Sequence, residues 1–265
     1  MKNITFIALF LLSNAVFATT YYVDADAQGT NTGTSWTNAF TNLQAAINAS
    51  SNGDLLFVKA GTYYPTQQMI TGNARSRAFY INKNIKIYGG FNGTESTISE
   101  RNFTVNTTIL SGDFNGNDTD TNGNGINDFG QGENAYSVVL AYNLDNTALI
   151  DGFKIFGGNA DGTAIYTLGG YEVKTANGGG IHNIHSNLVV KNTKFTNNSA
   201  SFGGGMANKG ECFPKIEFCD FTYNYGAYGN SIHINDATLA TINNCTFTSN
   251  RGSGVLMSLN SSVMK

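Results

Sequence analysis

The sequence repeats a Phe-Thr-x-Asn pattern three times, as Phe195-Thr196-Asn197-Asn198, Phe221-Thr222-Tyr223-Asn224 and Phe247-Thr248-Ser249-Asn250. Each phenylalanine lies 26 residues from the next. Two further positions recur in the same register, five and two places before each phenylalanine: Val190, Ile216 and Ile242, and Thr193, Cys219 and Cys245. A fixed period of this length indicates a repeat protein in which each unit stacks on its neighbours.

Glycine clusters add a second landmark to each period, as in Gly178-Gly179-Gly180-Ile181 and Gly203-Gly204-Gly205-Met206. One period then holds three short β-like runs separated by Gly or Asn turns, which fits strands of about five residues. Because a single unit cannot bury its own apolar side chains, its strands have to pair in parallel with the units above and below. The pattern predicts an all-β parallel β-helix with the three phenylalanines stacked inside.

A tight bend is expected between the two recurring positions, because the side-chain parity changes there. Asn192 and Asn244 occupy the bend in two units, and Asn tolerates the left-handed conformation. Phe218 stands at the same place in the middle unit and interrupts the expected stack of asparagines.

The first half of the chain is less regular but shows the same elements. Four further strand runs are punctuated by glycine, at residues 54–63, 85–91, 137–141 and 149–155. Before them, residues 41–49 place Leu43, Ala46 and Ile47 on one helical face. We expect a short amphipathic helix there that caps the first unit of the solenoid.

The glycine clusters alternating with Phe-x-x-Asn resemble the repeats of the chlamydial polymorphic outer-membrane protein family. The opening Tyr21-Tyr22-Val23-Asp24, the expected helix and residues 54–64 resemble the start of pectin-lyase-like proteins, especially secreted ones from Bacteroidetes. The resemblance covers nearly all of residues 19–265 and implies a single-stranded right-handed parallel β-helix. It is weak for function, because lyases, hydrolases, adhesins and passenger domains share this fold.

Residues 1–18 read as a secretory signal peptide: Lys2 precedes a short apolar core, and Ala15-Val16-Phe17-Ala18 ends the segment. Residues 19–265 then form one β-helix domain, which we expect to be secreted or exposed on the cell surface. No later stretch is long and apolar enough for a membrane span, and a net charge of −3 argues against nucleic-acid binding. The sequence ends just after a strand-like run without a cap, so we expect the domain to lack its C-terminal end.

A calcium loop is the most local chemical prediction. Oxygen-bearing side chains stand at the first, third, fifth and ninth places of residues 120–128, with a glycine at the sixth, as in loops that bind Ca²⁺. The predicted ligands are Asp120, Asn122, Asn124, the carbonyl of Ile126, and Asp128. This segment is similar to the Asp-rich repeats of thrombospondin type 3. The alternative is a polar insertion between units, spanning residues 113–133, with no bound ion.

Histidines and cysteines give two further predictions. His182 and His233 follow equivalent positions two units apart, so we expect surface histidines on one outer face, with Ala207 between them. Cys219 and Cys245 occupy equivalent inward positions and should touch, either as buried thiols or as a disulfide.

Catalytic signatures are weak. The arginines at 75, 77, 101 and 251 do not fall in the register of His182, and the carboxylates of Glu211, Glu217, Asp220 and Asp236 match no hydrolase motif. Five tyrosines could form a sugar-stacking surface: Tyr166, Tyr171, Tyr223, Tyr225 and Tyr228. We therefore expect a structural, adhesive or glycan-binding module with a polysaccharide or cell-surface glycan as partner. The alternative is a polysaccharide lyase or glycoside hydrolase of the pectin-lyase-like group.

Overall fold

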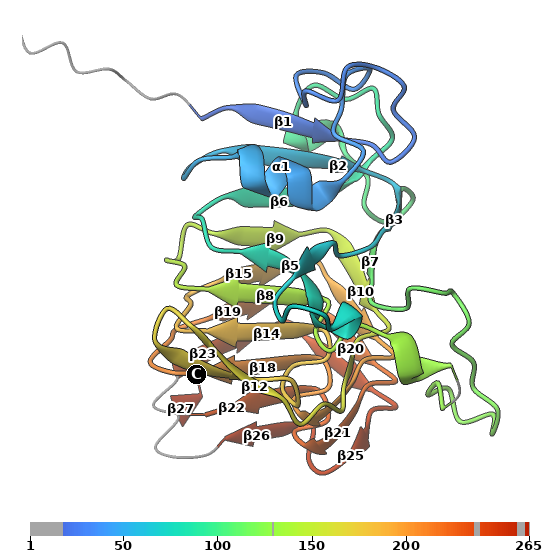
Figure 1. Cartoon of the computed structure of the whole chain (residues 1–265), viewed down its shortest axis with the longest axis vertical. Coiled ribbons are helices and arrows are strands. Elements are labelled where there is room, and N and C mark those ends of the chain that lie inside the picture. Colours follow the sequence, from blue (N-terminus) through green and yellow to red (C-terminus); the bar gives the residue numbers. More distant parts are fainter. Residues whose placement is uncertain (1–17, 129, 236–238, 259–262, 265) are drawn as a thin grey trace, which may run out of the picture.

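Parallel strands from distant parts of the chain stack into long sheets (Figure 1). The computed structural model describes residues 18–128, 130–235, 239–258, 263 and 264. Residues 1–17, which hold nearly all of the predicted signal peptide, and Asp236 lie outside this range. Within it, no helix is long and apolar enough to cross a membrane.

Three sheets run along the stack, and we name them by their strand number. The eight-strand sheet contains β1 (Thr20–Val23), β2 (Leu55–Lys59), β6 (Lys86–Phe91), β9 (Leu149–Asp151), β15 (Val189–Lys191), β19 (Lys215–Glu217), β23 (Leu239–Asn243) and β27 (Val263–Met264). The six-strand sheet contains β3 (Gly61–Tyr63), β7 (Thr108–Ser111), β10 (Phe153–Phe156), β16 (Lys194–Thr196), β20 (Asp220–Thr222) and β24 (Thr246–Thr248). The seven-strand sheet contains β4 (Gln67–Gln68), β5 (Arg77–Ile81), β8 (Val139–Tyr142), β14 (Ile181–Ile184), β18 (Met206–Lys209), β22 (Ile232–Ile234) and β26 (Leu256–Ser258).

Shorter elements complete the described fold. A four-strand sheet contains β11 (Asn159–Ala160), β17 (Ser199–Phe202), β21 (Tyr225–Tyr228) and β25 (Arg251–Gly252). The antiparallel hairpin consists of β12 (Ile165–Leu168) and β13 (Tyr171–Lys174). The helical elements are α1 (Leu43–Ala49) and the 3₁₀ turns η1 (Ala74–Ser76), η2 (Ile98–Glu100) and η3 (Gln131–Glu133).

The 26-residue period sets the strand register. Phe195 pairs with Phe221, and Phe221 with Phe247, on parallel neighbouring strands. From β14 to β18 the chain visits the seven-, eight-, six- and four-strand sheets in turn and then returns to the first. The prediction of an all-β chain with parallel stacked strands is therefore confirmed.

The predicted phenylalanine stack lies in the core. The rings of Phe195 and Phe221 are parallel at 4.5 Å between centroids, and those of Phe221 and Phe247 lie 5.1 Å apart. Phe195 and Phe221 are fully buried, in the same cluster as Ile216 and Cys219. Burial of one such side chain contributes roughly 1.5–3 kcal/mol, so this column is one of the features through which the repeat stabilises the fold.

Left-handed residues form two corners in each unit. The predicted bend is present at Asn192, Phe218 and Asn244, whose φ angles are 47°, 55° and 52°. A second left-handed corner follows each core phenylalanine by two residues, at Asn197, Tyr223 and Ser249.

The hydrogen-bonded asparagine column lies at this second corner. It consists of Asn198, Asn224 and Asn250, each the last residue of a Phe-Thr-x-Asn pattern. At the first corner, Asn192 instead donates its Nδ2 to Asp151 at 2.8 Å.

The predicted N-terminal helix is confirmed as α1. Its Leu43, Ala46 and Ile47 are buried, and it packs against β1, β2 and β5 (Figure 1). Asn42 caps the helix by accepting a hydrogen bond from the Ala45 amide at 3.2 Å.

The hairpin β12–β13 and its neighbours overturn the expectation of surface histidines. His182 and His233 do share a face, with Ala207 paired between them. They are nevertheless only 1% and 4% exposed. Side chains of the hairpin, including Val173 and Tyr166, join an apolar cluster on the outer side of this sheet. The hairpin is not part of the repeating unit, so the 26-residue period could not predict that these histidines are buried.

Candidate functional site

A groove of about 720 Å³ crosses the exposed face of the six-strand sheet, over β7, β10, β16 and β20. Alternation along each strand decides which side chains line it: Ile155, Phe195 and Phe221 point into the core, so their neighbours point outward. The outward residues include Ile109, Lys154, Lys194, Thr196, Asp220 and Thr222. The repeat that builds the core therefore also arranges the groove.

Two lysines stand side by side on its floor. Lys154 pairs in register with Lys194, and Lys194 with Asp220, so these side chains follow one another at the strand spacing of about 4.8 Å. Burial lowers the pKa of Lys154, and the charge of Lys194 lowers it further. Among the described residues, neither ammonium group forms an ion pair. The floor thus presents two positive charges without a countercharge in contact.

Aromatic side chains border the same groove. Phe103 and Phe218 are 38% and 56% exposed, large fractions for phenylalanine. Phe218 takes the left-handed corner position that asparagine fills in the units on either side. Half-buried Tyr223 lines the groove and is the one predicted sugar-stacking tyrosine found there. Lysines beside exposed rings suit an anionic sugar, because rings stack on the sugar face and lysines bind its charge.

The loop of residues 113–133 projects from the side of the stack (Figure 1), and its Gly125 contacts Tyr223 of the groove. Gly125 lies against the Tyr223 ring so closely that an added Cβ would stand 2.1 Å from Cε1. The Asn127 amide donates to Oδ1 of Asn197 at 3.1 Å. The loop therefore supports one border of the groove.

A second groove of about 560 Å³ lies on the eight-strand sheet and is also lined by lysines. Here Lys191 and Lys215 pair with Glu217 at 2.8 and 2.7 Å. Hydrogen bonds from Lys191 and then Lys215 lower the pKa of Glu217 to about 2. Lys191 and Lys215 thus share a carboxylate in contact, unlike Lys154 and Lys194, so this face is a weaker candidate for an anionic ligand.

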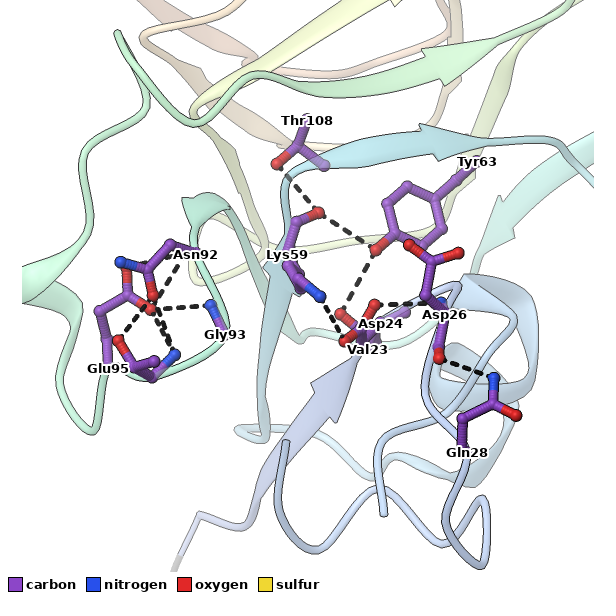
Figure 2. Close-up of polar contacts among 11 residues, drawn as sticks. Val23, Asp24, Asp26, Gln28, Lys59, Tyr63, Asn92, Gly93, Glu95 and Thr108 are labelled. Atoms are coloured by element: carbon purple, nitrogen blue, oxygen red, sulfur yellow. Dashed lines mark hydrogen bonds and ion pairs between the residues drawn. The ribbon is translucent and has the colours of Figure 1, made fainter. Parts of the chain in front are cut away.

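Two separate polar networks lie at the N-terminal end, one around Lys59 and one around Glu95 (Figure 2). Lys59 binds Asp24 at 2.8 Å, and the Tyr63 hydroxyl donates to the carbonyl of Lys59 at 3.1 Å. Glu95 accepts backbone N–H groups of Asn92, Gly93 and Thr94. Burial raises the pKa of Tyr63 above its usual value. These groups already satisfy one another, so the networks stabilise the fold and are not candidates for chemistry.

The predicted calcium ligands lie in the projecting loop, where they hydrogen-bond one another. The Asp120 carboxylate accepts the amides of Asn124 at 3.2 Å and Gly125 at 2.5 Å. Asp128 accepts the amide and hydroxyl of Thr121, both at 2.8 Å, and a bond from Asn122. Asn124 Oδ1 accepts the Ile126 amide at 2.9 Å. Calcium binding by this loop stays a prediction.

Three of the arginines make contacts that stabilise the fold. Arg75 binds Asp161 at 2.6 Å and Arg101 binds Asp151 at 2.8 Å, while Arg77 lies over the Phe114 ring at 3.8 Å. None of the three lines the groove on the six-strand sheet.

All three cysteines are free thiols. A hydrogen bond between the Cys219 and Cys245 thiols raises the pKa of Cys219, and burial raises it further. The same bond lowers the pKa of half-buried Cys245 to about 7. The expected contact is thus present, as a pair of thiols and not as a disulfide.

The other tyrosines do not gather on one surface. Tyr166 packs in the apolar cluster under the hairpin, Tyr171 lies against His185 with ring centroids 3.5 Å apart, and Tyr228 stacks on Phe202 at 5.0 Å. Tyr225 is 43% exposed on β21. The lysines at 154 and 194 were missed from the sequence. Their outward parity beside Ile155 and Phe195 is the signal that could have found them.

Comparison of the chain with protein-family models, curated proteins and solved structures gave no match. The assignment of function therefore rests on the geometry of the groove.

Proposed function

We propose that residues 19–265 form one right-handed parallel β-helix that is exported and binds an acidic polysaccharide at the cell surface or outside the cell. The cyclic order of the parallel sheets supports the β-helix. The lysine pair of the six-strand groove, beside exposed aromatic rings, supports the ligand. A carboxylated or sulfated sugar supplies the countercharge that the lysines lack.

Binding without cleavage is the simpler activity for this groove. Its lining holds four titratable side chains, Lys154, Lys194, Asp220 and Tyr223. A lyase has to neutralise the substrate carboxylate and also remove a proton, and a hydrolase of the usual kind has to bring two carboxyl groups together. We therefore place the module among adhesive or glycan-binding proteins and keep the lyase and hydrolase as the alternative.

Titration of the protein with polygalacturonate and with neutral dextran tests the proposal. We expect polygalacturonate to bind, dextran not to bind, and affinity to fall as salt screens the charges. Lys194→Gln should weaken binding at least about tenfold, because a charge-assisted hydrogen bond is worth about 1.5–3 kcal/mol.

Lys215→Gln is the matched control, since it removes a lysine from β19 of the eight-strand sheet, outside the proposed binding groove. Equal losses in both variants, or equal binding of the two polymers, would contradict the proposal. Ultraviolet absorbance recorded during the titration would reveal an unsaturated product and favour the lyase.

A further inference from the structure

Three carboxylates meet at the neck of the projecting loop. The chain leaves β7 and returns toward β8 with the Ala135 amide bonded to the Gly112 carbonyl at 2.9 Å. Directly outside this closure, Asp113, Asp118 and Glu133 each place an oxygen within 4.8 Å of the others. Asp113 is 3% exposed and the other two are half-buried. Residues twenty apart in sequence thus form a compact group of negative charge.

No cationic side chain in the described part of the chain pairs with this group. Among the described residues, none of the three carboxylates forms an ion pair. Asp113 accepts the amides of Gly116, Asn117 and Asp118, which hold it in place without neutralising its neighbours. Burial raises the pKa of Asp118 to about 6, and the charges of Asp113 and Glu133 add to the effect. Partly buried carboxylates at this spacing repel one another unless a cation lies between them.

Asn134 supplies an independent sign of a ligand. It is fully buried, and its Nδ2 donates to Oδ2 of Asp118 at 2.8 Å, so its amide group faces the carboxylates. Its Oδ1 is nevertheless buried without a hydrogen-bond partner among the described residues. Oδ1 of Asp118 is likewise buried without a hydrogen-bond partner among the described residues. Buried oxygens of this kind are normally satisfied, by protein, water or an ion.

Asn117 adds further oxygen to the group. Its amide lies against the carbonyl oxygen of Gly130 and Oε1 of Glu133, within 3.3 Å of both. The amide can donate its hydrogens to these oxygens, or it can share a cation with them through Oδ1. Asn117 and the Gly130 carbonyl thus border the carboxylate group at Glu133.

We propose that the neck of the loop binds one Ca²⁺ ion through Asp113, Asp118 and Glu133, with Asn134 Oδ1 as a neutral ligand. Calcium takes six to eight oxygen ligands in a flexible geometry. Zinc prefers histidine and thiolate, which this group lacks. The ion would replace the missing countercharge and hold the two ends of the loop together. This proposal places calcium at the neck and not among the ligands predicted for residues 120–128, and it does not depend on sugar binding.

Calorimetric titration of the chelator-treated full chain with CaCl₂ tests the proposal, with thermal unfolding followed by circular dichroism as the second measurement. We expect one ion per chain, with Kd of about 10⁻⁴–10⁻³ M, the range of extracellular modules. Calcium at about 10 mM, well above that range, should raise the melting temperature.

Asp118→Asn keeps the shape of the side chain but removes its charge, and should weaken calcium binding at least tenfold. Asp128→Asn is the matched control within the same loop, and should leave the affinity within about twofold of wild type. Circular dichroism spectra of both variants show whether they fold. A large loss in Asp128→Asn with none in Asp118→Asn would move the ion to residues 120–128 and overturn the proposal. So would the absence of heat and thermal shift in the wild type, or binding of Mg²⁺ as tight as that of Ca²⁺.

Discussion

The asparagine column should respond to a single substitution at its centre. Asn224 is fully buried and takes part in four side-chain hydrogen bonds within the column. Its Nδ2 donates to the Phe195 carbonyl at 2.9 Å and to Oδ1 of Asn250 at 3.0 Å. Its Oδ1 accepts the amide of Asn198 at 3.1 Å and its Nδ2 at 3.0 Å.

Asn224→Ala removes all four bonds and leaves neighbouring groups buried. The Asn198 amide loses its side-chain acceptor, and Nδ2 of Asn198 keeps only its bond to the carbonyl of Ile155. Each buried group left without a partner costs about 1–3 kcal/mol. Two such donors predict a loss of roughly 2–6 kcal/mol in the free energy of unfolding, a large share of the usual total of about 5–15 kcal/mol.

Urea denaturation followed by far-ultraviolet circular dichroism measures this loss. Asn250→Ala is the control, because Asn250 makes the equivalent bonds one unit later but is half-buried, so water can replace its side chain. We expect the control to cost about 1 kcal/mol. If Asn224→Ala costs no more than Asn250→Ala, the column is not a main source of stability and the reasoning fails.

Three further predictions concern titratable groups. Burial lowers the pKa of His182 to about 3, aided by nearby positive charge, so the folded state stays neutral at a pH where the unfolded state takes up a proton. Between pH 6.5 and 3 this site should cost about 1.4 kcal/mol of stability per pH unit, and His182→Leu should flatten the acid limb of a urea series recorded across that range. The pKa of Glu217 is lowered instead by lysine hydrogen bonds, so its contribution is present above pH 4.5 and lost as pH falls through 2. Glu217→Gln should therefore cost up to about 1 kcal/mol at pH 7 and nothing near pH 2, as the same series would show. Thiol titration of the denatured chain should find three reactive groups, with Cys245 labelled before Cys219 in the native protein because its pKa is lowered to about 7 and it is less buried; a single reactive thiol after denaturation would mean a disulfide.

The sequence predicts the core of this fold well because stacking imposes the same demand on every unit. The phenylalanine column, the strand register and the left-handed corner at residues 192, 218 and 244 all follow from the 26-residue period. Helix α1 follows from a different pattern, the helical spacing of the apolar residues Leu43, Ala46 and Ile47. Each of these features depends on residues that are close in sequence or related by a fixed shift.

Features that depend on segments outside the repeat could not be predicted in this way. The burial of His182 comes largely from a hairpin at residues 165–174, which has no equivalent in the following units. The carboxylates at the neck are brought together by loop closure between Gly112 and Ala135, which no local pattern records. The predicted calcium motif in the same loop was visible because all of its residues are contiguous.

The two lysine-bearing faces show which positions of such a repeat are free to acquire a binding function. Inward positions are held by packing, whereas outward positions can change without disturbing the stack. On the eight-strand sheet, Lys191 and Lys215 both pair with Glu217, so each has a carboxylate in contact. On the six-strand sheet, Lys154 and Lys194 are adjacent and unpaired by any described acid, which costs stability unless something outside the protein binds them. In our proposal an acidic ligand lies over these two lysines, and Phe218 at the exposed corner borders it.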